Sequence, residues 1–298
     1  MKYFPAFAVL ASMLLPVLVA LGVWQGYRKW QDRGGKRSPI EGKAIYGAGE
    51  QLRKRIEEYT DELMFSLMAL QFVGPLIFAL WAALRIDWGQ HRFLYTDILY
   101  VAGFVGFGAW CLKRVLKFGD LRRRAREGLR AELFTAQELN RLMAVGCVVL
   151  HDLPGDGFNI DHVVIGPRTV FAIETKSVRK PGPSKGGDHF KVKYDGTALQ
   201  FPHTTGKAHL AQAQRQAQWL SRYLSQAINT TVPVTPALSL PGWWIDSAHA
   251  PFDGVRVFNP SGKGALFMAE QRGERTIRPE IQALITQALV MRYPSTQP

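Results

Sequence analysis

The sequence predicts two parts, a helical membrane module followed by an α/β domain. Three long apolar runs all lie before Phe118. After Phe118, helical patterns alternate with short strand-like runs, which is typical of an α/β fold. The formal net charge of +13 indicates a polyanionic partner, either nucleic acid or the anionic face of a membrane. We therefore divide the chain into a membrane module, residues 1–118, and a second domain, residues 119–298.

The first apolar run, residues 3–24, is long enough to cross a bilayer as a helix. A cleavable signal peptide would have a shorter apolar core, a more basic start and small residues at its exit, so we interpret this run as an anchor. Residues 63–84 and 93–112 form the second and third predicted transmembrane helices. Both are too long and too uniformly apolar for the core of a soluble domain. Asp97 is the one charged residue of the third run, and near the outer end its cost is small.

Lys and Arg residues are concentrated between the first two runs and after the third, whereas the second connection contains only Arg85 and Arg92. The positive-inside rule then places the amino terminus outside, residues 25–62 inside and everything after Phe118 in the cytoplasm. We expect a multi-pass protein of a bacterial-type inner (plasma) membrane. The RRRAR run, residues 122–126, fits a lipid-surface anchor better than a nucleic-acid patch. A channel or transporter would need more polar residues in its spans.

The second domain begins with a predicted helix, residues 121–145, whose apolar face is formed by Leu129, Leu133, Ala136, Leu139 and Met143. The later predicted helices are residues 209–228 and 279–291, and the predicted strands are residues 147–153, 159–177 (two strands), 232–240, 243–245 and 255–258. The two cysteines, Cys111 and Cys147, have no partners at zinc-ligand spacing. This excludes a zinc ribbon and a disulfide framework, and it fits a reducing compartment.

Glu132 lies inside the apolar face of the first of these helices. A carboxylate in such a place must be paired, protonated or bound to a metal ion. The alternative is a partly exposed glutamate at the edge of the face, paired with a neighbouring arginine. The sequence leaves both interpretations open.

The stretch 159–177 predicts two strands joined by a turn, with Asp161 on the first and Glu174 and Lys176 near the end of the second. Side chains alternate along a strand, so the loop length decides which of them share a face. An even loop, such as residues 165–168, places Asp161 on the same face as Glu174 and Lys176. An odd loop places them on opposite faces unless a bulge intervenes.

Two carboxylates that meet at a strand end make a hard oxygen site suited to Mg²⁺ or Mn²⁺. The metal ion would polarise a phosphate and lower the pKa of a bound water, and Lys176 would orient that water or offset charge in the transition state. By itself E-x-K is a very weak signal, because an exposed strand can carry it. The surrounding Val, Ile, Phe and Ala residues strengthen it, since charged residues at the end of a buried strand need a reason.

The order G-L-R-A-E, V-V-L-H-D-L, I-D-H-V-V-I-G-P and V-F-A-I-E-T-K-S, followed by a helix with Q-A, resembles the NERD (nuclease-related) domain of the PD-(D/E)XK nuclease superfamily. The resemblance covers about residues 122–224. It implies a restriction-endonuclease-like fold, in which a central mixed sheet is flanked by helices. Ile160 stands where the superfamily has its proline, although the NERD pattern commonly lacks that proline.

The resemblance also implies roles for individual residues. Glu132 would be the helical acidic residue, Asp161 and Glu174 the strand metal ligands and Lys176 the catalytic lysine. One of Gln212 and Gln216, which lie one turn apart on the predicted helix 209–228, should reach the site, and the family pattern favours Gln212. The expected activity is Mg²⁺- or Mn²⁺-dependent hydrolysis of phosphodiester bonds, with DNA as the expected substrate. The rival prediction is a catalytically silent module that uses the same fold to bind nucleic acid or a protein at the membrane.

Residues 178–207 are rich in glycine and lysine, and such a stretch can follow a phosphate backbone. The candidate contacts are Lys180, Lys185, Lys191 and Lys193. A solvated hairpin is an equally good interpretation. The histidines in and near this stretch do not have zinc-ligand spacing, and a late tryptophan pair, Trp243 and Trp244, is more typical of a core than of a base-stacking surface.

Overall fold

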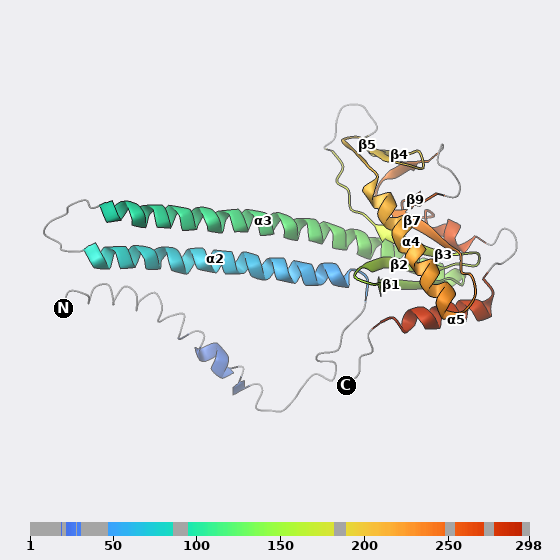
Figure 1. The fold of residues 1–298 in the computed structure, drawn as a ribbon, viewed down its shortest axis with the longest axis horizontal. Coiled ribbons are helices and arrows are strands. Elements are labelled where there is room, and N and C mark those ends of the chain that lie inside the picture. The colour runs from blue at the N-terminus through green and yellow to red at the C-terminus, as the bar shows by residue number, and fades with distance from the viewer. Residues whose placement is uncertain are drawn as a thin grey trace. The chain divides into compact units, whose positions relative to one another are not determined.

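The computed structural model describes residues 19, 22–27, 29–30, 47–85, 95–181, 189–247, 254–270 and 277–293. The chain divides into two compact units. The first unit contains residues 1–43 and 56–123, and the second contains residues 44–55 and 124–298. Figure 1 shows the ribbon with its elements labelled.

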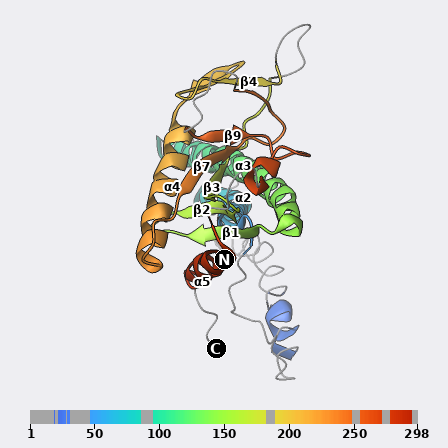
Figure 2. The same cartoon turned by 90° about the vertical axis from the view of Figure 1, so that its right-hand side faces the viewer.

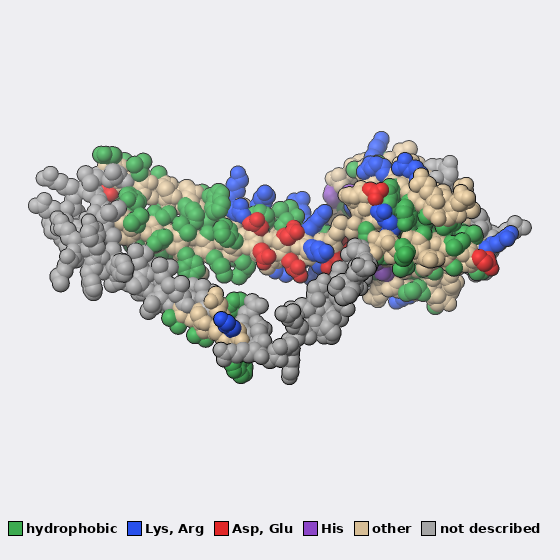
Figure 3. Space-filling model, turned by 60° about the horizontal axis from the view of Figure 1, so that its bottom comes forward, with side chains coloured by type: hydrophobic (Ala, Val, Ile, Leu, Met, Phe, Trp, Pro, Cys, Tyr) green, Lys and Arg blue, Asp and Glu red, His purple; other side chains and the backbone are tan. Residues whose placement is uncertain are grey.

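Two long helices, α2 (Glu50–Arg85) and α3 (Tyr95–Asn140), contain the second and third predicted spans. Within the described residues, the helical segments Glu50–Ala82 and Asp97–Val145 are long and apolar enough to cross a membrane, which suggests membrane association. Most of the predicted first span, residues 3–24, lies outside the described residues, so three spans are not confirmed. Figure 3 shows hydrophobic side chains along one stretch of these helices and charged side chains along the next.

Polar contacts join α2 to α3 inside the first unit. Asp97 is buried and accepts a hydrogen bond from Trp81 Nε1 at 3.0 Å, so its carboxylate is held by the neighbouring helix. Arg114 of α3 pairs with Glu62 of α2 and donates from Nε to Ser66 Oγ at 3.3 Å. These contacts satisfy charges that would otherwise be costly between two apolar helices.

The second unit has a five-stranded mixed sheet in the order β1-β2-β3-β7-β9. Its strands are β1 (Val148–Pro154), β2 (Asn159–Ile165), β3 (Val170–Thr175), β7 (Val234–Ser239) and β9 (Arg256–Phe258). The first three strands are antiparallel neighbours, whereas β3, β7 and β9 run parallel. The parallel pair β3 and β7 is joined through helix α4 (Ala208–Ala227), as parallel strands require a long crossover.

Helices cover both faces of this sheet, as Figure 2 shows from the end. On one face Val163, Ile165 and Ala172 pack with buried residues of α4 and of α5 (Pro279–Val290). On the other face Val164, Phe171 and Ile173 pack with the end of α3 and with the short 3₁₀ helices η1 (Arg141–Val145) and η2 (Leu266–Ala269). The predicted α/β layering is confirmed as a mixed α/β fold.

A second, four-stranded mixed sheet has the order β6-β5-β4-β8 and was not predicted. Its strands are β4 (Lys191–Tyr194), β5 (Leu199–Phe201), β6 (Thr204–Gly206) and β8 (Trp244–Asp246). Three of them come from the glycine- and lysine-rich stretch 178–207. The inner face of this sheet, including Val192, Tyr194 and Leu199, packs against Leu210 and Ala213 at the start of α4.

The predicted helix 121–145 is the last part of α3 and ends at Asn140, after which the chain tightens into η1. Part of its predicted apolar face was wrong, because Leu133 is 38% exposed and Met143 51% exposed. The buried side also contains polar residues, Thr135 and Glu138, which the apolar pattern could not identify.

Candidate functional site

The hairpin of β2 and β3 decides whether the predicted site residues meet. Its register pairs Ile165 with Val170, so the loop is residues 166–169, four residues long and one residue later than expected. The even loop puts position 161 opposite position 174. Asp161 and Glu174 therefore share the face that packs against α4.

The two strands part at the candidate site. Their pairing ends at His162 and Ile173, although both strands continue beyond this point. The backbone N–H of Thr175 donates instead to Asp161 Oδ2 at 2.7 Å. The Asp161 carboxylate thus accepts the hydrogen bond from a β3 backbone N–H that no longer pairs with the backbone of β2.

Glu174 is a buried carboxylate with a partner on each oxygen. The residue is 2% exposed. Lys176 Nζ lies 2.5 Å from its Oε1, and Gln216 Nε2 donates to its Oε2 at 2.6 Å. A buried charge is tolerated only when it is paired and hydrogen-bonded in this way.

The glutamine that reaches Glu174 is Gln216, and not Gln212 as expected. Gln216 is buried, and its Nε2 also donates to the carbonyl of Asn159 at 3.2 Å. Gln212 lies one turn earlier on α4 and is half-buried. The packing of α4 on β3 and β7 brings position 216 level with Glu174, and this depth cannot be deduced from the helical pattern.

Glu132 of α3 belongs to the same electrostatic cluster. Its pKa is raised to about 7, first by burial and then by the nearby charges of Asp152 and Glu174, whereas Lys176 and Arg55 act in the opposite direction. The pKa of Asp161 is also raised, first by desolvation and then by the charges of Glu174 and Glu132. Asp161 keeps some accessible surface as a residue, but its carboxylate is enclosed by protein. The cluster thus contains more acidic groups than the single charge of Lys176 can neutralise.

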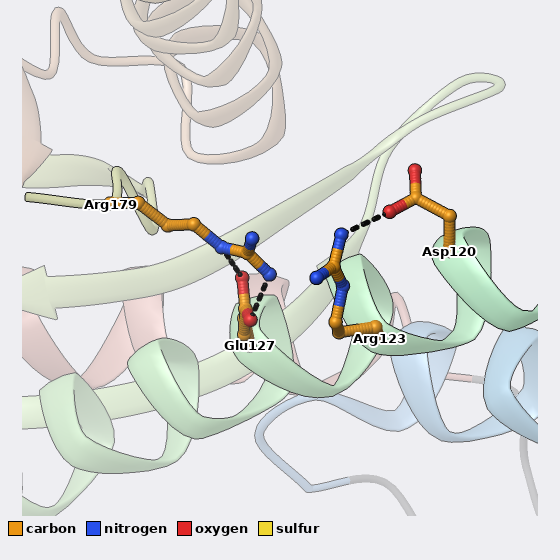
Figure 4. Close-up of polar contacts among 4 residues, drawn as sticks. All are labelled: Asp120, Arg123, Glu127 and Arg179. Carbon is orange, nitrogen blue, oxygen red and sulfur yellow. Dashed lines mark hydrogen bonds and ion pairs between the residues drawn. The ribbon is translucent and has the colours of Figure 1, made fainter. Parts of the chain in front are cut away.

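The segment after Lys176 is tied back to α3. Arg179 Nε donates to Glu127 Oε2 at 2.8 Å, and Arg179 Nη2 pairs with the other oxygen of the same carboxylate (Figure 4). One turn earlier on α3, Arg123 pairs with Asp120. The Arg179 pair joins the chain that leaves β3 to the helix that carries Glu132.

Part of the second unit is similar to a known protein family. Residues 127–241 match the family model of the nuclease-related domain, NERD. This chain carries a NERD domain. No curated protein and no solved structure matches the chain. The matched region contains Glu132, Asp161, Glu174 and Lys176, and it extends to β7 and the turn after it.

Two further residues of the NERD domain lie at the cluster, and the sequence did not lead us to predict them. Asp152 on β1 is buried, has a positive φ of 50° and accepts a hydrogen bond from Asn159 Nδ2 at 2.7 Å. An aspartate inside the apolar strand V-V-L-H-D-L was a signal for it. His209, which looked incidental, has its pKa lowered first by burial and then by the charge of Lys176, which places it near that lysine.

The predicted lysine contacts are spread over different places. Lys180 lies over the ring of Trp243, with its Nζ 5.5 Å from the ring centroid. Lys191 and Lys193 are on β4 of the second sheet. Lys185 lies outside the described residues.

The donor set suits a hard divalent cation, because its carboxylates are close enough to raise one another's pKa. Within the ranges that the structure describes, no three His, Cys, Asp or Glu side chains are placed so that they could hold a metal ion together. Mg²⁺ does not require such a cage, since it keeps several waters and uses one or two carboxylates together with substrate phosphates. The residues therefore fit the metal ion in donor type and charge.

Proposed function

We propose that the NERD domain of this protein is a metal-dependent nuclease that hydrolyses phosphodiester bonds, with DNA as substrate. One observation carries the proposal. Asp161 and Glu174 share a face at the point where β2 and β3 part, with Lys176 on Glu174 and Glu132 in the same charge cluster. Clustered carboxylates with perturbed pKa values beside one lysine are typical of catalytic sites.

Each residue has a role in this proposal. Asp161 and Glu174 would hold Mg²⁺ or Mn²⁺ together with waters and substrate phosphates, and Glu132 would add negative charge nearby; the metal ion would polarise the phosphate and acidify the attacking water. Gln216 keeps the Glu174 carboxylate in place, because it bonds that carboxylate and the β2 backbone together. Lys176 would hold the water and offset the charge that develops on the phosphate.

We further propose that the protein is anchored in an inner membrane, with the NERD domain on the cytoplasmic side. The apolar parts of α2 and α3 and the flanking Lys and Arg residues support this arrangement.

The test uses the full-length protein in detergent with plasmid DNA, single-stranded DNA and RNA. We expect cleavage with Mg²⁺ or Mn²⁺ and none with EDTA. Asp161→Asn, which keeps an acceptor for the Thr175 N–H, and Lys176→Ala should each lower the rate by roughly 10²-fold or more. Glu280→Gln, an exposed change in the first turn of α5, serves as the control and should retain the wild-type rate.

A second candidate function is a catalytically silent module that binds nucleic acid or a protein. The observation that favours it is that both Glu174 oxygens are already occupied by side chains of the protein. Absence of metal-dependent cleavage on all three substrates, by protein that is folded, would support this function and reject the nuclease.

A further inference from the structure

The outer face of the second sheet combines an exposed aromatic ring with lysines. Side chains alternate along a strand, and Val192, Tyr194 and Leu199 are buried, so their neighbours point outward. The residues of this outer face are Lys191 and Lys193 on β4, Gln200 on β5, Thr205 on β6, and Trp244 and Asp246 on β8. The strand register sets Trp244 beside Lys191, and Lys193 between Asp246 and Gln200.

The two adjacent tryptophans have opposite environments. Trp243 is 1% exposed, and its Nε1 donates to the carbonyl of Val178 at 3.1 Å, so it belongs to the core. Trp244 is 64% exposed. Its backbone N–H donates to the carbonyl of Phe190, which ties β8 to the residue before β4. A single exposed apolar residue is ordinary, but an exposed tryptophan on a face that also carries Lys191 and Lys193 has the composition of a binding surface.

The chemistry of this face favours a single-stranded nucleic acid. Unpaired bases stack on aromatic rings, and lysines follow the phosphate backbone. Gln200 and Thr205 add amide and hydroxyl groups for further hydrogen bonds. Two lysines against one aspartate leave the face positive, which complements a phosphate chain. Insertion into a membrane interface is disfavoured by Asp246, Gln200 and Thr205 on the same face, since these groups would lose their hydration there.

We propose that the outer face of the second sheet binds single-stranded nucleic acid, with one base stacked on Trp244 and the backbone passing Lys191 and Lys193. The inference rests on the proposed function in that it names the substrate class of the same domain. The inner face of this sheet packs on the first turns of α4, the helix that carries Gln216. A strand held on the outer face would thus be bound by an element attached directly to the scaffold of the site.

The experiment measures binding in EDTA, where cleavage cannot occur, so it is independent of catalysis. Full-length protein in detergent is titrated into a fluorescein-labelled oligodeoxythymidylate longer than the ~16 nucleotides at the upper end of OB-fold site sizes, and anisotropy is recorded. We expect tighter binding to this strand than to a duplex of equal length. Trp244→Ala should weaken it roughly 5- to 150-fold, the range for one base stack, and Trp244→Phe should retain most of it.

Charge and surface controls complete the design. The double change Lys191→Gln and Lys193→Gln should reduce the slope of log affinity against log salt by about 1.4. Met291→Ala and Lys263→Gln, which are exposed and lie on other elements, should bind as the wild type does. The inference is overturned if Trp244→Ala binds the single strand like the wild type, or if this change reduces binding to anionic vesicles instead. If the protein cleaves DNA but Trp244→Ala does not change single-strand binding, the nuclease proposal is retained and only the binding surface is rejected.

Discussion

At the scale of single residues, the site depends on how one buried charge is satisfied. Glu174 has Lys176 on one oxygen and Gln216 on the other, and Gln216 also bonds the backbone of β2. Lys176 offsets the negative charge, whereas Gln216 fixes the orientation of the Glu174 carboxylate. Loss of either partner would leave a buried carboxylate incompletely bonded, which costs more than the loss of an exposed contact.

The two glutamines of α4 provide a matched comparison. Gln216→Leu keeps the volume but removes the hydrogen bond to Glu174, so we expect a loss of about 1.5–3 kcal/mol in the free energy of unfolding. Gln212→Leu, one turn away and half-buried, should change it by less than about 0.5 kcal/mol. Thermal unfolding of both variants, followed by tryptophan fluorescence, measures the difference. Equal effects would contradict the assignment of Gln216.

The raised pKa of Glu132 predicts a pH dependence of stability without metal. The folded protein keeps this proton up to about pH 7, whereas the unfolded chain releases it near the ordinary value of 4.5. The folded state therefore binds more protons between these values, and stability falls as pH rises through this window. The loss is at most about 3 kcal/mol, and less after solvent screening.

Glu132→Gln removes this titration, so its unfolding midpoint in EDTA should fall less between pH 5 and pH 7.5 than that of the wild type. Parallel pH profiles of the two proteins would show that the carboxyl is not perturbed.

At this scale the sequence predicts part of the site. The sequence left open whether Asp161 and Glu174 share a face, because this depends on the loop parity; the four-residue loop of the structure gives the even case. Asp152 was missed because it occupies an irregular position with a positive φ, which no periodic pattern signals. The choice between Gln212 and Gln216 depends on how deeply α4 sits on the sheet, a property of packing and not of the sequence of the helix.

At the scale of elements, the end of α3 is attached to the sheet by a buried polar contact. Thr135 and Ser239 are both fully buried, and their hydroxyl groups lie 2.9 Å apart, between α3 and β7. This contact fixes the rotation of the helix that carries Glu132. It also accounts for the wrong part of the predicted apolar face, because Thr135 is buried against the sheet whereas Leu133 is 38% exposed.

A double-mutant cycle tests this attachment. Thr135→Val leaves the Ser239 hydroxyl buried without its partner, and should cost about 1–3 kcal/mol of unfolding free energy. Adding Ser239→Ala should recover part of the loss, since both polar groups are then gone. Additive effects of the two changes in chemical denaturation would mean that the hydroxyls do not interact.

The second sheet shows where prediction of elements stops. Its strands are three or four residues long. Strands this short contain at most one full alternation, so the pattern is indistinguishable from a loop. The short strands also explain why the exposure of Trp244 was not predicted. Without a recognised strand, the sequence does not indicate which of two adjacent tryptophans points outward.

At the scale of the whole molecule, charge distribution predicts the orientation in the membrane. By the positive-inside rule, the basic residues around the apolar runs predict that residues 86–94 lie outside and the NERD domain inside. The native cysteines, Cys111 and Cys147, are buried, so single introduced cysteines report location cleanly.

In intact spheroplasts, a membrane-impermeant maleimide should label Gln90→Cys, whereas Ser261→Cys should react only after permeabilisation. The unchanged protein should stay unlabelled in both conditions. Labelling of Ser261→Cys in intact cells would reverse the proposed topology.

The first turn of α2 has a consequence for how the protein can be divided. Residues 44–55 belong to the same compact unit as the NERD domain, and Gly49, with a φ of 77°, packs so closely that a Cβ there would overlap Leu129 Cδ1. A fragment that starts at residue 119 would therefore lack the part of its own compact unit that packs beside Glu132. Truncated proteins that lack this segment need it supplied back, as a fused or added peptide, before a lack of cleavage can be taken as a property of the NERD domain.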